Sequence, residues 1–270
     1  KSHSISYSIL AAWTAYLKFN HPQEFFLSLL RMTKYEPSPQ EEINKICQDL
    51  PYFNIKLLSP DLALSNMDFS ISDKDIRFGL NSIKGISEKS LSALKEFRDS
   101  EKPNKYDIFL SAKSAGLNIG ILSALIQAGA LSSYKTNRPR LVLEAQVFNL
   151  LTDREKRNFI LLGERYNYDI LNAIHDVVTN KVVGDDNRLI MADKRFNTLK
   201  NNYLNYKKIY EKNKRYEDFA NWYFEKSLLG FSYSKELRDS FGNGNENLQN
   251  SLHFESCDRN TKSKYIAVVD

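Results

Sequence analysis

The run Ile83-Lys84-Gly85-Ile86-Ser87 most constrains how this chain can fold. It lies between two stretches whose apolar residues recur at helical spacing. A glycine at this point lets the backbone adopt a left-handed conformation that other residues rarely take, and the serine hydroxyl can cap the next helix. The pattern therefore predicts two helical segments joined by a tight hairpin, with free backbone amides at the start of the second helix.

This hairpin has the chemistry of a phosphate-binding site. Amides at a helix start bind anions, and the nearby lysines add positive charge. Contacts of this kind are made to the nucleic-acid backbone and carry no sequence information. We therefore predict that duplex DNA is bound by Lys84, Gly85, Ile86, Ser87 and Lys89. The alternative is a hairpin with a purely structural role.

A second candidate hairpin follows at Leu117-Asn118-Ile119-Gly120, before a helical stretch over residues 122–128. If it is a degenerate copy of the first hairpin, Asn118 and Gly120 are further DNA contacts. A plain helical turn explains the same residues equally well, so both interpretations stay open.

The remaining chain is predicted to be mainly α with minor β. Alternation in Phe69-Ser70-Ile71 and Ile76-Arg77-Phe78 predicts a small β-hairpin. Helical periodicity covers residues 4–20, 23–32, 40–50, 88–99, 106–114 and 119–128, and most of the chain from residue 138 onward. A further stripe at steps of three and four predicts helix packing rather than base stacking. It consists of Phe196, Leu199, Tyr203, Tyr206 and Tyr210.

Charge is distributed unevenly along the chain. Residues 188–226 contain ten Lys or Arg and five Asp or Glu, a net +5 that equals the net charge of the whole chain. This favours a polyanionic neighbour, although a solvated helix face gives the same count. No apolar run is long enough to span a membrane, and no signal peptide is visible. The two cysteines and four histidines lack disulfide or zinc-site spacing, so we expect no metal site.

The first residues form a second candidate site. Lys1, Ser2 and His3 immediately precede a helix, whose positive end favours a triphosphate, and Tyr7 lies one turn on. The alternative is that these residues bind no ligand, because many helices begin with polar residues.

Several segments resemble the C-family of bacterial-type replicative DNA polymerases, the alpha subunits of DNA polymerase III. The likeness covers residues 1–134 most fully, residues 225–270 less so and residues 135–220 least. The segments that carry it are Lys1-Ser2-His3-Ser4-Ile5-Ser6-Tyr7-Ser8, Thr14-Ala15-Tyr16-Leu17-Lys18, Pro22, Glu24-Phe25, Pro60-Asp61, Ser65, Asp68-Phe69, Ile76-Arg77-Phe78-Gly79-Leu80, Ile83-Lys84-Gly85-Ile86, Leu125-Ile126-Gln127-Ala128-Gly129-Ala130 and Glu225-Lys226-Ser227-Leu228-Leu229-Gly230-Phe231.

The resemblance implies an order of domains. Residues 1–75 would be the C-terminal part of the polymerase fingers, with Lys1, Ser2, His3 and Tyr7 facing the incoming dNTP. Residues 76–134 would be a tandem helix-hairpin-helix domain that holds primer-template duplex. Residues 135–224 would be a helical linker or insertion, and residues 225–270 would lead into an OB-like domain at its first strand. Two departures stand out: the family usually has glycine at Ser87 and a Gly-His-Pro turn near Ser232.

The resemblance also implies that the chain lacks the catalytic centre. In this family the palm carboxylates, which hold two Mg²⁺ ions, precede the fingers segment. We therefore expect no catalytic residue and no metal here, an inactive chain on its own, and a partner chain or missing segment that carries the palm. A split gene, for example in a virus, or a shortened polypeptide explains this equally well. The expected location is the cytoplasm of a bacterial cell or of a virus-infected bacterial cell.

Other interpretations remain. Gly184-Asp185-Asp186-Asn187 could be a polymerase-like Gly-Asp-Asp turn between short strands, but a polar turn is the simpler interpretation. Gln249, Leu252 and Phe254 have the spacing of a sliding-clamp ligand, which makes a clamp a further candidate partner. The main alternative function is a non-catalytic helix-hairpin-helix DNA-binding module with no polymerase partner.

Overall fold

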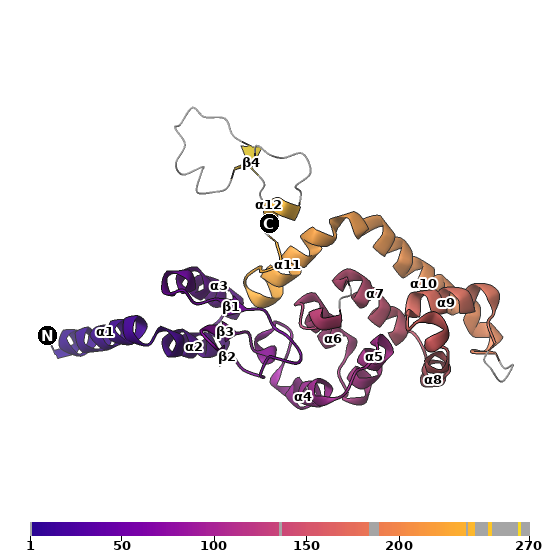
Figure 1. Ribbon diagram of the computed structural model, residues 1–270, viewed down its shortest axis with the longest axis horizontal. Helices are drawn as coiled ribbons and strands as arrows, with labels where there is room; N and C mark the ends of the chain where they lie inside the picture. Colours follow the sequence, from indigo (N-terminus) through magenta and orange to yellow (C-terminus); the bar gives the residue numbers. More distant parts are fainter. Residues whose placement is uncertain are drawn as a thin grey trace.

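The computed structural model describes residues 2–134, 137–183, 189–235, 237–240, 248–249 and 264–265, with only the backbone at residues 2–3, 238–239, 248–249 and 264–265. The described chain is elongated and mostly helical, with α1 at one end and α8 and α9 toward the other (Figure 1). The predicted class, mainly α with minor β, is confirmed. No helix in the described ranges is long and apolar enough to cross a membrane.

The first half of the chain consists of short helices around one small sheet. Its elements are α1 (Ser2–Asn20), α2 (Pro22–Met32), η1 (Thr33–Tyr35), α3 (Pro39–Asp49), η2 (Leu50–Phe53), β1 (Leu57–Leu58), β2 (Ser70–Ser72), β3 (Asp75–Arg77), η3 (Leu80–Ser82), η4 (Glu88–Ser90), α4 (Leu91–Asp99), α5 (Lys105–Ser114), α6 (Ile119–Gln127) and η5 (Ser132–Tyr134). The prolines of α2 and α3 stand at the first helical position, where a missing N–H costs no hydrogen bond.

The second half is mostly helical, as predicted. Its elements are α7 (Arg138–Asn149), α8 (Asp153–Leu161), η6 (Glu164–Tyr166), α9 (Ile170–Asn180), α10 (Asp193–Asn213), η7 (Lys214–Tyr216), α11 (Glu217–Leu229), α12 (Leu237–Ser240), β4 (Leu248–Gln249) and β5 (Lys264–Tyr265). Helices α10 and α11 form an arch over α6 and α7, which brings the end of α11 back to α3 (Figure 1).

The predicted β-hairpin is present and carries one extra strand. Strands β2 and β3 are antiparallel, with Ile71 opposite Ile76, and the turn between them contains Asp73 at φ 54°. Strand β1 adds parallel to β3, with Leu57 opposite Ile76. The strands are too short to form a core of their own, so the sheet depends on the helices against which it packs.

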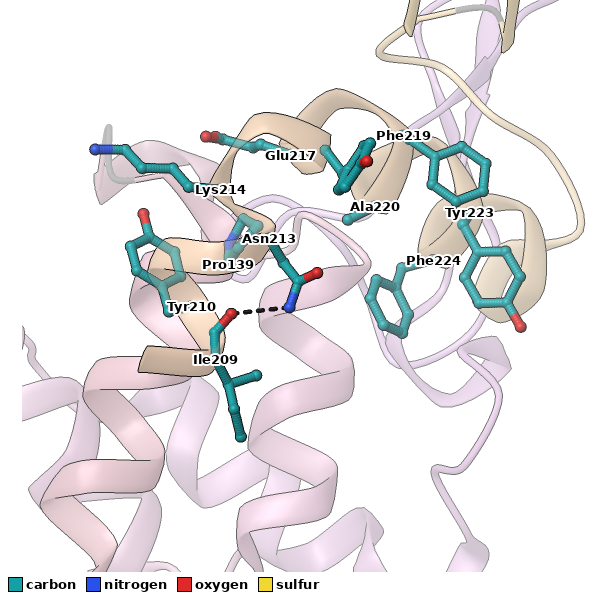
Figure 2. Close-up of a pocket in the computed structure, with 11 residues that line it drawn as sticks. Pro139, Ile209, Tyr210, Asn213, Lys214, Glu217, Phe219, Ala220, Tyr223 and Phe224 are labelled. Atoms are coloured by element: carbon teal, nitrogen blue, oxygen red, sulfur yellow. Dashed lines mark hydrogen bonds between the residues drawn. The ribbon is translucent and has the colours of Figure 1, made fainter. Parts of the chain in front are cut away.

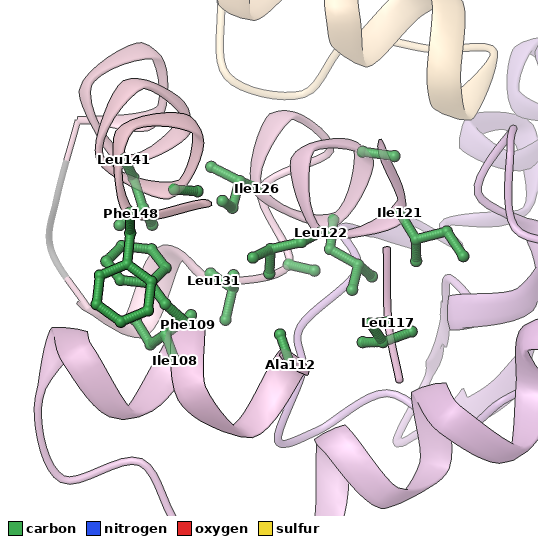
Figure 3. Close-up of a cluster of buried hydrophobic side chains, with 14 of the residues drawn as sticks. Ile108, Phe109, Ala112, Leu117, Ile121, Leu122, Ile126, Leu131, Leu141 and Phe148 are labelled. Atoms are coloured by element: carbon green, nitrogen blue, oxygen red, sulfur yellow. The ribbon is translucent and has the colours of Figure 1, made fainter. Parts of the chain in front are cut away.

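One continuous apolar core runs through the described chain. Around α5, α6 and α7, buried side chains from three helices interdigitate (Figure 3). Among them are Phe109 and Phe148, whose ring centroids lie 5.2 Å apart. The predicted packing stripe on α10 belongs to this core, because Phe196, Leu199 and Tyr203 are buried there, with Tyr206 and Tyr210 half-buried beside them.

Helix α1 differs from the others because its apolar side chains face solvent. Its last residues contact the helices that follow: Lys18 pairs with Asp49 of α3 at 2.8 Å, and the rings of Phe19 and Phe53 lie 5.6 Å apart. The rest of α1 extends away from the described chain beyond α2 (Figure 1). Its large exposed apolar side chains are Ile5, Tyr7, Ile9, Leu10, Trp13, Tyr16, Leu17 and Phe19. An apolar surface of this size on a projecting helix is typical of a surface that another polypeptide covers.

A bidentate ion pair fixes α10 against α8. The Nε and Nη2 atoms of Arg195 donate to the two carboxylate oxygens of Glu155 at 3.0 and 3.1 Å. Burial alone would raise the pKa of Glu155, but hydrogen bonds from Arg195 and Thr152 outweigh it and hold this pKa below its usual value. The pair therefore stabilises the folded state when Glu155 is ionised.

We expect Arg195→Ala to lower the free energy of unfolding by about 2 kcal/mol at neutral pH, because it leaves a nearly buried carboxylate without its charged partner. The contribution is present above the unfolded carboxyl pKa of ~4.3 and is lost as the pH falls through the lower folded value. Urea unfolding of both proteins between neutral and acid pH measures this. A difference that stays constant down to acid pH would contradict the ion-pair explanation.

Candidate nucleic-acid interface

The first hairpin has the geometry that its sequence predicts. Gly85 has φ +93°, in the left-handed region, and Ser87 occupies the N-cap position of η4, which continues into α4. Ile83 is buried and Ile86 packs on the core, whereas Lys84, Gly85 and Ser87 are exposed. Two isoleucines thus anchor the hairpin and leave its polar residues at the surface.

The flanking elements differ in one respect from the prediction. Only a 3-10 turn, η3, precedes the hairpin, where the sequence predicts a helical segment. Gly79 explains why the chain turns so sharply there, because a Cβ on Gly79 would meet the backbone carbonyl carbon of Asp68 at 2.5 Å. This close approach holds η3 against the segment before β2. A glycine is therefore required at position 79 because a side chain would have no room, and not because the backbone is left-handed there.

Some backbone amides of the hairpin form hydrogen bonds within the chain, and others are left without an acceptor. The Lys84 amide donates to the Leu228 carbonyl at the end of α11 at 3.0 Å, and the Ser87 amide donates to Ser90 Oγ at 3.1 Å. Within the described ranges, the amides of Gly85, Glu88 and Lys89 have no hydrogen-bond acceptor. Glu88 and Lys89 lie in the first turn of η4, where the dipole favours an anion, and Gly85 lies in the hairpin two residues before the N-cap Ser87.

Side-chain charge at the hairpin is mixed but net positive. Lys84 and Lys89 are exposed, as predicted, and Glu88 stands between them in the first turn. A groove of about 270 Å³ runs beside the hairpin toward α3 and is also lined by Lys34, which sequence reasoning missed. Lys34 lies fifty residues upstream and carries no motif, so only the folded chain brings it to Lys84.

The second candidate hairpin is a tight turn between α5 and α6. Asn118 caps α6, because its Oδ1 accepts from the Ile121 amide at 2.9 Å. The positive φ falls on Gly116, at +78°, whereas Gly120 lies inside the first turn of α6 without a positive φ. The turn glycine is therefore Gly116. Its signal in the sequence is a glycine directly after a helix end.

The predicted nucleotide-contact residues are only partly described. Lys1 lies outside the described residues, and for Ser2 and His3 the structure gives the backbone of α1 alone. Tyr7 lies on α1 with 71% of its surface exposed. The role of these four residues stays a prediction.

The predicted C-terminal features mostly lie beyond the described ranges. Leu252 and Phe254 fall outside them, and Gln249 is described only as the backbone of β4. Strand β4 pairs in parallel with β5, in the segment expected to lead into an OB-like domain. Clamp binding and the OB-like domain therefore stay predictions.

The Gly-Asp-Asp turn also falls outside the described residues. The chain on either side of it pairs by a single antiparallel bridge between Val183 and Leu189. Within the described ranges, no group of three His, Cys, Asp or Glu side chains lies together to hold a metal ion.

A buried carboxylate joins the domain of the hairpins to the segment after α11. Glu225 is fully buried and accepts from Arg138 Nη1 at 2.6 Å and from the Tyr233 and Ser234 amides at 2.9 and 3.1 Å. It also accepts from the Ser232 hydroxyl at 2.9 Å. The turn that replaces the family's Gly-His-Pro is thus held by Glu225, a role that a helix-surface pattern does not indicate.

Comparison with known proteins agrees with this geometry. Residues 54–141 match the model of the helix-hairpin-helix motif. The chain is 33% identical over 145 residues to DNA polymerase III subunit alpha of Aquifex aeolicus, a match that covers 53% of this chain and 12% of that protein. It is 31% identical over 144 residues to the subunit of Thermus aquaticus, with 53% and 12% covered. The subunit of Chlamydia trachomatis is 31% identical over 162 residues, with 58% and 13% covered.

The matched region is thus a small part of each relative, although it is about half of this chain. The resemblance drawn from the sequence motifs is confirmed over this length. The chain is related in sequence to the alpha subunit of DNA polymerase III and carries a helix-hairpin-helix motif.

Proposed function

We propose that this chain is part of a replicative DNA polymerase, in which its first hairpin binds the primer-template duplex through the phosphate backbone. The observation that carries the proposal is the set of unpaired amides of Gly85, Glu88 and Lys89 beside exposed Lys84, within the matched motif. Their donors suit phosphate oxygens, which every duplex presents whatever its sequence.

The surrounding fold holds the hairpin in one conformation. Ile83 lies in the apolar core and Ile86 packs on it, and the Lys84 amide donates a hydrogen bond to the Leu228 carbonyl at the end of α11. A hairpin whose backbone is fixed before binding loses little conformational freedom when it takes up a phosphate. The expected consequence is binding that depends strongly on salt and weakly on sequence.

We expect Lys84→Glu to weaken duplex binding about tenfold and to reduce the salt dependence by about one phosphate contact. Lys74→Glu is the matched control, because Lys74 is equally exposed but lies in the turn between β2 and β3. Fluorescence anisotropy with a labelled duplex measures both variants. Equal affinities for the two variants at low salt would remove the hairpin from the proposal.

We further propose that α1 contributes to the pocket for the incoming dNTP, through Lys1, Ser2, His3 and Tyr7, and that its exposed apolar face packs on the palm-bearing part of the polymerase. The support is the projecting position of α1 and its exposed aromatic and aliphatic side chains. The catalytic carboxylates and Mg²⁺ would belong to that other part, and no step in the chemistry is assigned to this chain. The proposed location is the cytoplasm of a bacterial cell, where such polymerases copy DNA.

A pull-down from the native source, with this chain as bait, tests the assignment to a polymerase. We expect mass spectrometry to identify a polypeptide with clustered palm carboxylates, and we expect primer extension only from the complex. Duplex binding by the chain without such a partner would instead favour the non-catalytic DNA-binding module, and the dNTP pocket on α1 would then be wrong.

A further inference from the structure

We propose that the bend between α10 and α11 is a second nucleic-acid site, which binds single-stranded DNA by taking up a base in an aromatic pocket. The bend borders an open pocket of about 310 Å³, a size at the lower end for ligand sites. None of its lining residues lines the groove beside the first hairpin, so the inference does not rest on duplex binding there.

The walls of the pocket are mainly aromatic. Figure 2 shows Tyr210 and Lys214 on one side of the pocket, and Phe219, Tyr223 and Phe224 on the other. The floor includes aliphatic atoms of Ile209 and Pro139. Aromatic rings with accessible faces bind bases of any sequence by stacking, because every base has a π face.

Two tyrosines that line the pocket are also exposed to solvent. Tyr216 is 43% exposed and Tyr223 is 49% exposed. The Arg215 guanidinium lies 4.6 Å from the centre of the Tyr216 ring, so a cation and a π face are presented together. The packing of the arch therefore leaves aromatic surface accessible where the chain bends.

The net charge around the pocket is positive, which favours a polyanionic ligand. Lys208, Lys212 and Lys214 are exposed, and within the described ranges none of them forms an ion pair. Two acidic groups also lie at the site: Glu217 lines the pocket and Glu211 follows the pocket residue Tyr210 on α10. Asp218 pairs with Lys235 at 2.6 Å. Residues 188–226 carry the entire net charge of the chain.

This combination distinguishes single-stranded DNA from other occupants. An apolar helix of a partner protein would fill the pocket but leave the unpaired lysines unused. Duplex DNA would satisfy the lysines but keep its bases stacked and out of reach of the rings. A flexible strand can place its phosphates on the lysines and one base between the rings.

The test uses the full chain and a labelled oligo(dT) of about 20 nucleotides, titrated by fluorescence anisotropy. We expect the double variant Tyr216→Ala/Tyr223→Ala to bind oligo(dT) about tenfold more weakly, and Lys212→Glu/Lys214→Glu to lose affinity and salt dependence. Tyr52→Ala is the control, since Tyr52 is 84% exposed on η2. Duplex affinity should be unchanged in the tyrosine variant, whereas Lys84→Glu should lower duplex affinity alone.

A mapping experiment on the unaltered chain needs no variant to fold. Oligo(dT) that contains 5-iododeoxyuridine should crosslink under ultraviolet light to the peptide that contains residues 216–224, as identified by mass spectrometry. Crosslinks confined to other peptides would overturn the proposal, as would full oligo(dT) affinity in the tyrosine variant. Binding of an acidic amphipathic peptide at the pocket, without oligo(dT) binding, would overturn it in favour of protein docking.

Discussion

Replacing Gly230 by alanine is expected to lower the free energy of unfolding by about 4 kcal/mol, one of the two largest effects predicted here. Gly230 ends α11 at φ +90°, a conformation that costs alanine about 1 kcal/mol or more. In addition, a Cβ there would meet the Gln40 carbonyl oxygen of α3 at 2.2 Å. Because both obstacles are backbone, neither can be relieved by a change of rotamer.

Gly116→Ala separates the two costs. Gly116 also has a positive φ, at +78°, but a Cβ there would have nothing within 4 Å. We therefore expect a loss of only about 1–2 kcal/mol for this variant. Urea unfolding followed by circular dichroism compares both proteins with the parent chain. Equal losses would show that α11 does not approach α3 closely, and would remove the support for the arch.

Glu225→Gln is the second substitution with a large expected effect, about 3–4 kcal/mol. The amide keeps the shape of the side chain but removes the negative charge that compensates Arg138. It also replaces one acceptor oxygen by an NH2 group, which would face other hydrogen-bond donors. Arg138 is itself largely buried, so its guanidinium would then lack a compensating charge. The segment of Ser232, Tyr233 and Ser234 would lose its anchor at the same time.

A double-mutant cycle with Arg138→Gln isolates the pair. We expect the double variant to be less destabilised than the sum of the single variants by about 2 kcal/mol, because neither charge is then left alone. Additive losses would mean that Glu225 acts only through the turn that follows α11. In that case the carboxylate would not couple the hairpin domain to the C-terminal segment.

Local signals in the sequence predicted most of the helices. Proline at the first position, capping residues and helical periodicity act over a few residues, so α2, α3 and α6 begin and end close to their predicted bounds. The small β-hairpin was predicted for the same reason, because alternation is a local pattern. The parallel strand β1 was not, since its pairing with β3 bridges about twenty residues and depends on the tertiary fold.

Within the candidate site, the sequence predicted only those features that depend on a residue's own type and its immediate neighbours. The left-handed conformation of Gly85 follows from the residue type, and its exposure follows from the isoleucines on either side. Lys34 and Glu225 could not be foreseen, because their partners lie far along the chain. The glycine at position 79 is explained by a distant backbone, and no short pattern encodes such a contact.

The aromatic stripe on α10 shows both outcomes in one helix. Its spacing predicted packing, and this is confirmed for Phe196, Leu199 and Tyr203. Toward the end of the helix the same stripe reaches Tyr210, which lines the open pocket at the bend. Periodicity predicts which face of the helix is buried. It does not predict where along the helix that face becomes exposed, because the end of burial depends on how α11 packs against α10.

The most direct test of the central claim is the affinity of the full chain for two duplexes of unrelated sequence, measured by anisotropy from about 50 to about 200 mM salt. We predict equal affinities for both duplexes at every salt concentration, and a steep linear fall of log K with log salt that becomes shallower in Lys84→Glu. A chain that fails to bind either duplex at low salt, or that prefers one sequence over the other with little salt dependence, would contradict the phosphate-binding hairpin.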